Sequence, residues 1–365
     1  YDLAKAWHGS GVLGAYHSGY PGWKLRPPAG FPLRSHAWRT VTTYAALRLP
    51  RAVRPDDERL FRWQDGGFDR AVGKALRRED GELVHALPGQ ALHTFRAARH
   101  LGVETCLNHA SGPLHRQLQT LRETAEKAGQ APPREPVAEL ERRAAETALA
   151  DWHCVASTIV RDQLLADGIG ADRIWVCPYA ADERVFYPSA EKRPAGKRIV
   201  FAGQITARKG LGVLFAALRR LPGATLDCYG PAGADAAAVL AGIDEPSRIR
   251  LHGAVPQAEL GERFRAADLL VLPSWEEAFG LVVPQALACG IPVVISDRVG
   301  ARDIVAHREQ GSIFPAGDAD ALAGEIAWWL DHPECFQPAV PTWPACADRL
   351  LDQIQRRHMH SPTAQ

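Results

Sequence analysis

Short apolar runs alternate with amphipathic segments along most of the chain. The runs predict strands at Leu83–Ala86, Val103–Leu107, Trp152–Ala156, Arg173–Cys177, Arg198–Ala202, Ala224–Tyr229, Arg248–His252, Asp268–Leu272 and Ile291–Ile295. Many of the segments between them carry apolar residues three or four positions apart, which is the spacing of one helix face. Strands and helices in alternation, separated by short Gly or Pro turns, are typical of parallel sheets covered by helices on both faces. The pattern predicts an α/β protein.

The predicted helices fall between and after these strands. They lie at Leu92–Leu101, Leu114–Ala128, Val137–Leu149, Val160–Ala166, Leu211–Leu221, Ala234–Ala241, Gln257–Ala266, Leu281–Cys289, Ala321–Leu330 and Cys346–Arg357. The segment Pro188–Lys197, with Pro and Gly among charged residues, separates two such alternations. We therefore expect two Rossmann-like domains with a cleft between them, residues 1–187 and 188–340, and a C-terminal segment, residues 341–365.

The N-terminal region is less regular. Asp2–His8 has a helical pattern, Gly11–Tyr16 is predicted as a strand, and residues 19–40, rich in Pro, Gly and Trp, are predicted as loop. A doubly wound domain ordinarily opens with a strand, so we expect a strand to precede Tyr1. Five arginines follow the loop and suit either a solvated helix face or a surface for anionic lipid or an anionic acceptor. They are Arg48, Arg51, Arg54, Arg59 and Arg62.

Composition narrows the class of protein. The 365 residues carry 43 Lys and Arg against 42 Asp and Glu, a balance that argues against a disordered tail and against a globally basic nucleic-acid binder. Seven cysteines show no regular spacing, which indicates neither a disulfide framework nor a zinc site and suits a reducing cytoplasm. The longest apolar run, Phe279–Ile295, is interrupted by two prolines, a glutamine and a glycine, so no membrane span is predicted.

Two motif matches are set aside. Gly9–Gly14 has the G-x-G-x-x-G spacing, but it follows a predicted helix and precedes a predicted strand, the reverse of the order that directs backbone N–H groups at a pyrophosphate. Asp318 and Asp320 have the D-x-D spacing of a metal clamp, yet they stand at the start of a predicted helix, where Asp318 has the ordinary role of N-cap. We therefore predict no metal site.

Two of the loops that follow predicted strands carry candidate chemistry. Gly203–Gly210 follows Arg198–Ala202 and opens a helix, with Gln204, Arg208 and Lys209 in between, a combination suited to phosphate. The loop after Asp268–Leu272 contains Glu277, an acceptor for sugar hydroxyls. Phe279, Gly280 and Leu281 follow it and are expected to start a helix. Gln285, eight residues after Glu277, is expected two turns into that helix and on the same face.

This second string resembles the E-x7-E region of the retaining, GT-B-fold glycosyltransferases of family 4. The resemblance extends to the loop ending in Lys209-Gly210, to Leu251-His252-Gly253, and to the segments Ile174–Tyr179 and Gly317–Leu330. It covers most of the chain from about Leu83. The fold it implies is two Rossmann-like domains of GT-B type, with the late helix crossing back to the first domain.

The resemblance also implies residue roles. Lys209 would contact the donor diphosphate, Glu277 the hydroxyls of the transferred sugar, and the backbone of residues 279–281 both. His109 matches the histidine of the first domain that faces the donor sugar. Two positions depart from the family: Gln204 replaces an arginine after Gly203, for which Arg208 is the expected substitute, and Gln285 replaces the second glutamate, which holds the nucleotide ribose.

The function implied is retaining, metal-independent transfer of a sugar from a nucleotide-diphosphate donor to a saccharide, lipid-linked or other hydroxyl acceptor, in polysaccharide or glycoconjugate assembly. No cofactor and no nucleic acid are expected. The location implied is the cytoplasm, either free or in peripheral contact with the inner face of the membrane. Two alternatives stay open: a degenerate protein of the same fold that binds a nucleotide sugar or a partner without turnover, and a two-domain epimerase.

Overall fold

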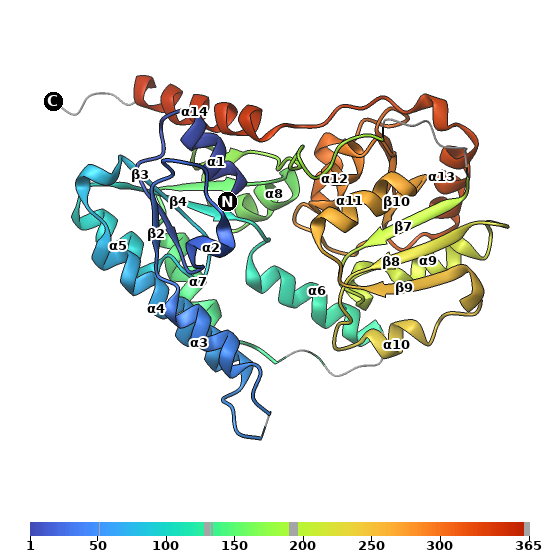
Figure 1. Ribbon diagram of the computed structural model, residues 1–365, viewed down its shortest axis with the longest axis horizontal. Helices are drawn as coiled ribbons and strands as arrows, with labels where there is room; N and C mark the ends of the chain where they lie inside the picture. The colour runs from blue at the N-terminus through green and yellow to red at the C-terminus, as the bar shows by residue number, and fades with distance from the viewer. Residues whose placement is uncertain (51, 128–131, 133, 190–195, 361–365) are drawn as a thin grey trace.

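The chain forms two parallel sheets with helices around them, each sheet in its own half of the molecule (Figure 1). This computed structural model describes all residues except 51, 128–131, 133, 190–195 and 361–365. The first sheet has the order β3 (Leu83–Ala86), β4 (Glu104–His109), β5 (Trp152–Val155) and β6 (Ile174–Val176). Most of the predicted linker, Pro188–Lys197, lies outside the described residues.

The second sheet has six strands in the order β12-β11-β10-β7-β8-β9. These are β7 (Arg198–Ala202), β8 (Thr225–Tyr229), β9 (Ile249–Gly253), β10 (Leu269–Leu272), β11 (Val293–Ser296) and β12 (Gly311–Phe314). The chain enters at β7 in the middle of the sheet, adds β8 and β9 on one side, and returns to β10 on the other. The direction of winding therefore changes between β7 and β10, and ligands of open parallel sheets bind beyond the carboxyl ends of the strands at such a point.

Helices cover both sheets and hold a largely apolar core. Those of the first half are α5 (Leu92–His100), α6 (Leu114–Lys127), α7 (Val137–Leu149) and α8 (Thr158–Ala166). Those of the second are α9 (Leu211–Leu218), α10 (Ala236–Leu240), α11 (Gln257–Ala266), α12 (Val282–Ala288) and α13 (Ala319–Asp331). Asp318 caps α13 by accepting hydrogen bonds from the amides of Asp320 and Ala321, which confirms the N-cap assignment.

Most of the predicted strands are present, within a residue or two at their ends. β12 was not predicted, because residues 311–314 do not form a long apolar run and the strand is defined by its pairing with β11. The N-terminal predictions were partly wrong. Residues 11–15 form no strand, and the first strand, β1 (Tyr16–Ser18), begins where that prediction ended. Gly11 has a φ of +72°, a left-handed turn conformation that no strand residue adopts.

The segment predicted as loop contains regular structure. β2 (Leu33–Ser35) pairs in parallel with β1 in a small separate sheet, and α2 (Gly22–Leu25) lies between the two. Because β1 and β2 are three residues each and are held by pairing across the loop, no local pattern indicates them. The Gly9–Gly14 match lies between α1 (Asp2–Gly9) and β1, the helix-then-strand order for which it was set aside.

The C-terminal helix α14 (Trp343–His360) returns to the first half and lies along α1 (Figure 1). Its buried Cys346 and Leu350 pack against side chains of the first sheet, among them Cys106, Cys154 and Trp175. This confirms the crossing that the family resemblance implies. No helix in the described part of the chain is long and apolar enough to cross a membrane.

Two buried carboxylates hold the N-terminal end of α5. Glu146 of α7 accepts from the amides of Gly89, Ala91 and Leu92 at 2.5 to 3.1 Å. Asp69, on helix α4 (Asp57–Ala75), accepts from the amides of His93 and Thr94 at 2.8 and 2.9 Å. Arg142 bridges the two carboxylates at 3.1 and 3.3 Å. Helix starts leave unpaired N–H groups, so this network ties three helices together.

We predict that Glu146→Gln destabilises the first half of the molecule by about 3 kcal/mol, because the amide turns a donor toward amide N–H groups and breaks a buried ion pair. Glu139→Gln is the matched control, since Glu139 pairs with Arg143 in the same helix at a partly exposed site. It should cost less than about 1 kcal/mol. Urea unfolding followed by circular dichroism measures both, and equal losses would contradict the assigned role of the network.

Candidate functional site

The loop after β7 is drawn tightly against the loop after β10. The amide of Gly203 donates to the carbonyl of Tyr229 on β8, and a short 3₁₀ turn, η3 (Ala207–Lys209), leads into α9. Gly210 has a φ of +72°, and a Cβ there would overlap the carbonyl oxygen of Pro273. Glycine is therefore required at 210 by backbone conformation and by the approach of the second loop.

The helix predicted to start at residues 279–281 is present after Glu277 as α12 (Val282–Ala288), but it starts later than predicted. Glu277 is extended and forms a β-bridge with Val299, and its carbonyl accepts from the amide of Gly300 at 2.9 Å. Gly280 then takes a φ of +92°, and α12 starts only at Val282. Gln285 therefore lies in the first turn of α12, and the prediction that it shares a helix face with Glu277 was wrong. The β-bridge and the left-handed glycine separate the two.

Two consecutive cations of the first loop pair with two consecutive carboxylates of the second. Arg208 donates from one guanidinium nitrogen to the carbonyl and to the carboxylate of Glu276, both at 2.9 Å. Lys209 forms a short ion pair with Glu277. The amide of Trp275 also donates to the carbonyl of Arg208 at 2.9 Å. The predicted residues Lys209 and Glu277, 68 positions apart, are thus in direct contact.

Burial raises the pKa of Glu276 above its ordinary value, and the neighbouring Arg208 opposes that rise. Glu276 is a site residue that the sequence analysis missed, and its position directly before Glu277 was the available signal. Arg208, the expected substitute for a family arginine, directs its guanidinium to Glu276 and is hydrogen-bonded to it. Gln204, which occupies the position of that family arginine, is exposed.

The remaining predicted residues lie around these pairs. Phe279 is buried, Leu281 is exposed, and Gln285 retains only 9% of its accessible surface. The carbonyl of Phe279 accepts from the amide of Ala301 at 2.7 Å. Within the described part of the chain, the N–H groups of Gly280, Leu281 and Val282, which come just before and at the start of α12, donate no hydrogen bond. These N–H groups are available to a negatively charged ligand.

The first half of the molecule contacts this site directly. Ser157 donates from Oγ to the carbonyl of Ala278 at 2.6 Å. The ring of Tyr179 stands edge-on to Phe279 at 5.3 Å, and its hydroxyl donates to Asn108 at the end of β4 at 2.9 Å. Helix α6 extends from the first half of the molecule toward the second (Figure 1) and lies against η3. None of these links was predicted, because each joins residues far apart in sequence.

His109 is the last residue of β4 and is buried. Its Nε2 lies 3.1 Å from Nδ1 of His153 on β5. Burial lowers the pKa of His109 to about 3 and that of His153 to about 4, so both rings are neutral near pH 7. The structure thus places His109 beside Asn108, which Tyr179 links to Phe279, while its own side-chain hydrogen bond goes to His153.

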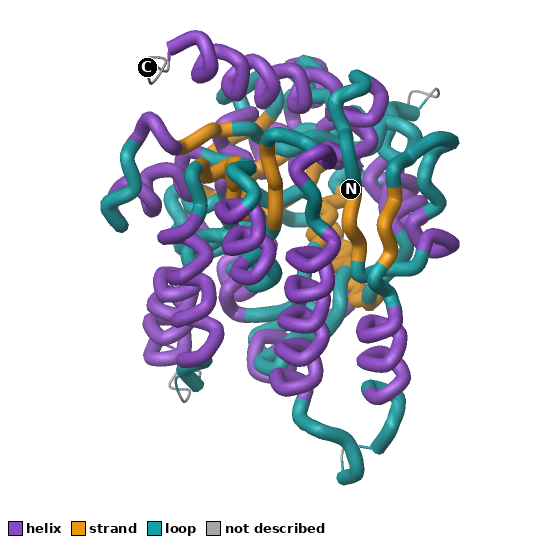
Figure 2. The backbone as a smooth tube through the Cα atoms, turned by 90° about the vertical axis from the view of Figure 1, so that its left-hand side faces the viewer, coloured by secondary structure: helices purple, strands orange, loops and turns teal. Residues whose placement is uncertain are grey.

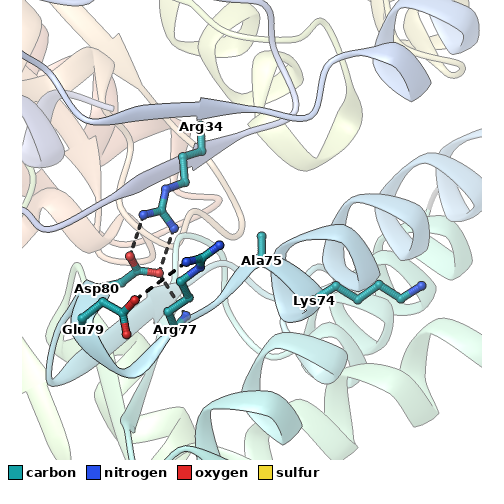
Figure 3. A pocket seen from close by; sticks show the side chains of 6 residues that line it. All are labelled: Arg34, Lys74, Ala75, Arg77, Glu79 and Asp80. Carbon is teal, nitrogen blue, oxygen red and sulfur yellow. Dashed lines mark hydrogen bonds and ion pairs between the residues drawn. The ribbon is translucent and has the colours of Figure 1, made fainter.

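Two cavities lie away from these loops. One, of about 390 Å³, is lined by Arg34, Lys74, Ala75, Arg77, Glu79 and Asp80, with Arg34 reaching across to Asp80 (Figure 3). The other, of about 310 Å³, is lined in part by Tyr187, by Leu287 of α12 and by Val340. Among the described residues, no group of three or more His, Cys, Asp or Glu side chains is arranged to hold a metal ion.

Comparison with known sequences places this site in a family. Residues 196–332, which contain both loops, match the family model described as glycosyl transferases group 1. D-inositol 3-phosphate glycosyltransferase 1 of Catenulispora acidiphila is 30% identical over 85% of this chain and 84% of its own length. GDP-mannose-dependent alpha-mannosyltransferase of Mycobacterium tuberculosis is 29% identical over 57% of this chain and 57% of its own length. The chain spans about half the length of another relative, D-inositol 3-phosphate glycosyltransferase from Segniliparus rotundus: it covers 50% of that protein, at 31% identity over 54% of this chain.

Solved structures share the architecture. Sucrose-phosphate synthase from Thermosynechococcus elongatus superposes with a TM-score of 0.63 at 22% identity, over 86% of this chain and 81% of that one. Anabaena Alr3699/HepE in complex with UDP superposes with a TM-score of 0.57 at 16% identity, over 80% of this chain and 78% of that one. Two parallel-sheet domains joined in this way form the GT-B fold. The relative aligned over most of both chains, together with the matched site loops, shows that this chain belongs to the glycosyl transferases group 1 family.

Proposed function

We propose that the protein transfers a sugar from a nucleotide-diphosphate donor to a hydroxyl acceptor, with retention of configuration and without a metal ion. The observation that carries the proposal is the contact between Lys209 and Glu277 at the winding change of the second sheet. Donor binding would exchange that ion pair for two others: Lys209 with the diphosphate, and the Glu277 carboxylate with hydroxyls of the sugar.

The chemistry follows from where negative charge develops. As the glycosidic bond to the diphosphate breaks, the leaving phosphate gains charge, and fixed positive groups stabilise that state. Lys209, Arg208 and the N–H groups of residues 280–282 are the groups placed for this task. Asp318 is used as a helix cap, so we assign charge compensation to these cations and N–H groups. Closure of the two halves over the donor would exclude water, which otherwise hydrolyses it.

The substrate class draws support from the relatives. Anabaena Alr3699/HepE is described in complex with UDP and with UDP-glucose, and the mycobacterial relative is named for GDP-mannose. For this chain we propose a nucleotide-diphosphate sugar as donor and a saccharide or lipid-linked hydroxyl as acceptor, in polysaccharide or glycoconjugate assembly on the cytoplasmic side of a membrane. Gln204 and Gln285 favour a second candidate, a protein that binds the nucleotide sugar without turnover.

We propose that His109 faces the donor sugar. Its hydrogen bond with His153 determines which ring nitrogen of His109 carries the proton. His153 Nε2 is buried without a partner in the described structure. A buried N–H without an acceptor is rarer in proteins than an acceptor without a donor, so the His153 proton belongs on Nδ1 and is donated to Nε2 of His109. His109 then carries its own proton on Nδ1, where it can donate to a sugar oxygen.

We expect Lys209→Ala to lower donor turnover about a hundredfold, equivalent to about 3 kcal/mol of barrier, because it removes one fixed charge from the leaving diphosphate. Arg219→Ala, which removes an exposed cation just beyond the far end of α9, is the control and should be neutral. Assays run in excess EDTA should show full wild-type turnover. Lys209→Ala activity within a few-fold of wild type, or activity that only Mg²⁺ or Mn²⁺ restores, would contradict the mechanism.

Gln285→Glu should tighten nucleotide binding about three- to tenfold, because a carboxylate accepts from both ribose hydroxyls while the amide offers one acceptor. Calorimetry with wild type and variant measures the change. Turnover by both proteins supports the enzyme, and turnover by the variant alone supports the non-catalytic binder. Unchanged affinity would show that Gln285 does not face the nucleotide.

His153→Leu should shift the His109 proton and lower kcat about tenfold, whereas His153→Asn, whose amide can still donate, should retain most activity. The ¹⁵N shifts of the His109 ring report its tautomer independently of activity. We expect protonated Nδ1 in wild type and in His153→Asn. A wild-type ring protonated on Nε2 would refute the assignment even if the enzyme is active.

A further inference from the structure

Helix α3 (Trp38–Ala46) turns two threonines inward and its large apolar side chains outward. Thr40 and Thr43 are buried, and the hydroxyl of Thr43 has no partner among the described groups. Trp38 and Val41, on the other face, keep 59% and 54% of their accessible surface. Together with α4, this helix forms a hairpin whose connecting loop projects from the body of the molecule (Figures 1 and 2). An ordinary surface helix has the opposite polarity.

The outward face of α3 is part of a region rich in exposed apolar side chains. Nine of the sixteen exposed large hydrophobic side chains in the described structure lie within residues 20–63. We call this set the hairpin patch: Tyr20, Trp23, Trp38, Val41, Tyr44, Leu49, Val53, Phe61 and Trp63. Trp23, at 78%, and Val53, at 71%, are the most exposed of all sixteen. A concentration of this kind marks an interaction surface.

Cations lie over the aromatic rings of the hairpin patch and join them. Trp38 and Trp63 meet edge to face at 5.4 Å, with the Arg39 guanidinium 4.4 and 4.3 Å from their centroids. Lys24 lies 4.4 Å from the ring centroid of Tyr20 and 5.3 Å from that of Tyr44. Rings and positive charges are therefore presented on the same surface.

Positive charge predominates in this region: residues 20–63 contain nine Lys and Arg against three acidic residues, Asp56, Asp57 and Glu58, at the start of α4. No Asp or Glu occurs between Asp2 and Asp56 in the sequence, a stretch that contains eight Lys and Arg. Lys24, Arg26 and Arg48 are exposed, and no carboxylate of the described residues lies within ion-pair distance of any of them. The net charge of the whole chain is only +1, so the positive charge is concentrated here.

We propose that the hairpin patch docks the protein on a bilayer surface containing anionic lipid. Trp and Tyr rings suit the headgroup layer, an apolar tip enters the acyl boundary, and Lys and Arg are attracted to anionic headgroups. A second copy of this chain is a poor occupant, because two patches of like charge repel. The inference goes beyond the proposed transfer reaction, since docking requires neither donor nor acceptor.

Co-sedimentation of the purified chain with vesicles tests the proposal. Wild type should bind vesicles of phosphatidylcholine mixed with phosphatidylglycerol, bind phosphatidylcholine alone at least tenfold more weakly, and lose binding as salt is raised. The double change Lys24→Gln with Arg48→Gln should weaken binding about 25-fold, at about fivefold for each cation. Trp23→Ser with Val53→Ser should weaken it at least tenfold, through the loss of inserted apolar surface.

Matched controls lie elsewhere on the surface. Arg96→Gln with Arg99→Gln removes two exposed cations of α5, and Val137→Ser removes an exposed apolar side chain at the start of α7. Both should bind as wild type does. Equal losses in controls and patch variants, or wild type that binds neither kind of vesicle, would overturn the proposal. So would light scattering that shows a wild-type dimer converted to monomer by the patch variants.

Discussion

Two adjacent ion pairs at the winding change of the second sheet hold the two candidate site loops together. β7 and β10 are neighbours in the sheet although about 70 residues separate them, and their loops meet at Gly210 and Pro273. That close approach sets consecutive cations opposite consecutive carboxylates, Arg208 to Glu276 and Lys209 to Glu277. Each charge is held by a partner that a charged ligand could replace, and under the proposed function the loops are ordered in advance for a substrate that carries both phosphate and hydroxyl groups.

The same loops connect the two halves of the molecule. Ser157 reaches the carbonyl of Ala278, and Tyr179 joins Phe279 to the end of β4, beside His109. The strand that carries the buried histidine pair is therefore linked through Tyr179 to the donor loop. The hairpin patch lies outside this connection and presents aromatic rings and positive charge to the exterior.

The sequence predicts those structural features that arise from residues close together in the chain, and it misses those that depend on distant contacts. Most buried parallel strands are continuous apolar runs, so β7 and β10 and the loops after them are recognisable, and with them Lys209 and Glu277. β1, β2 and β12 depend on pairing with distant strands and leave no such run. The helix predicted at Leu281–Cys289 is present as α12, but Glu277 and Gln285 do not share its face, because the bridge to Val299 and the left-handed Gly280 have tertiary causes. The roles of Glu276, Tyr179 and His153 arise from contacts across the fold, which spacing along the chain does not encode.

The central claim is that the loops after β7 and β10 together form a cradle for a nucleoside diphosphate. Thermal unfolding with a panel of nucleosides, nucleoside diphosphates and their sugars measures this most directly, because a ligand that binds only the folded state stabilises it by about 3 kcal/mol at a hundredfold excess over Kd. The account predicts that at least one diphosphate and its sugar raise the unfolding temperature while the matching nucleoside does not. A panel without any shift, or a nucleoside that stabilises as much as its diphosphate, would contradict it.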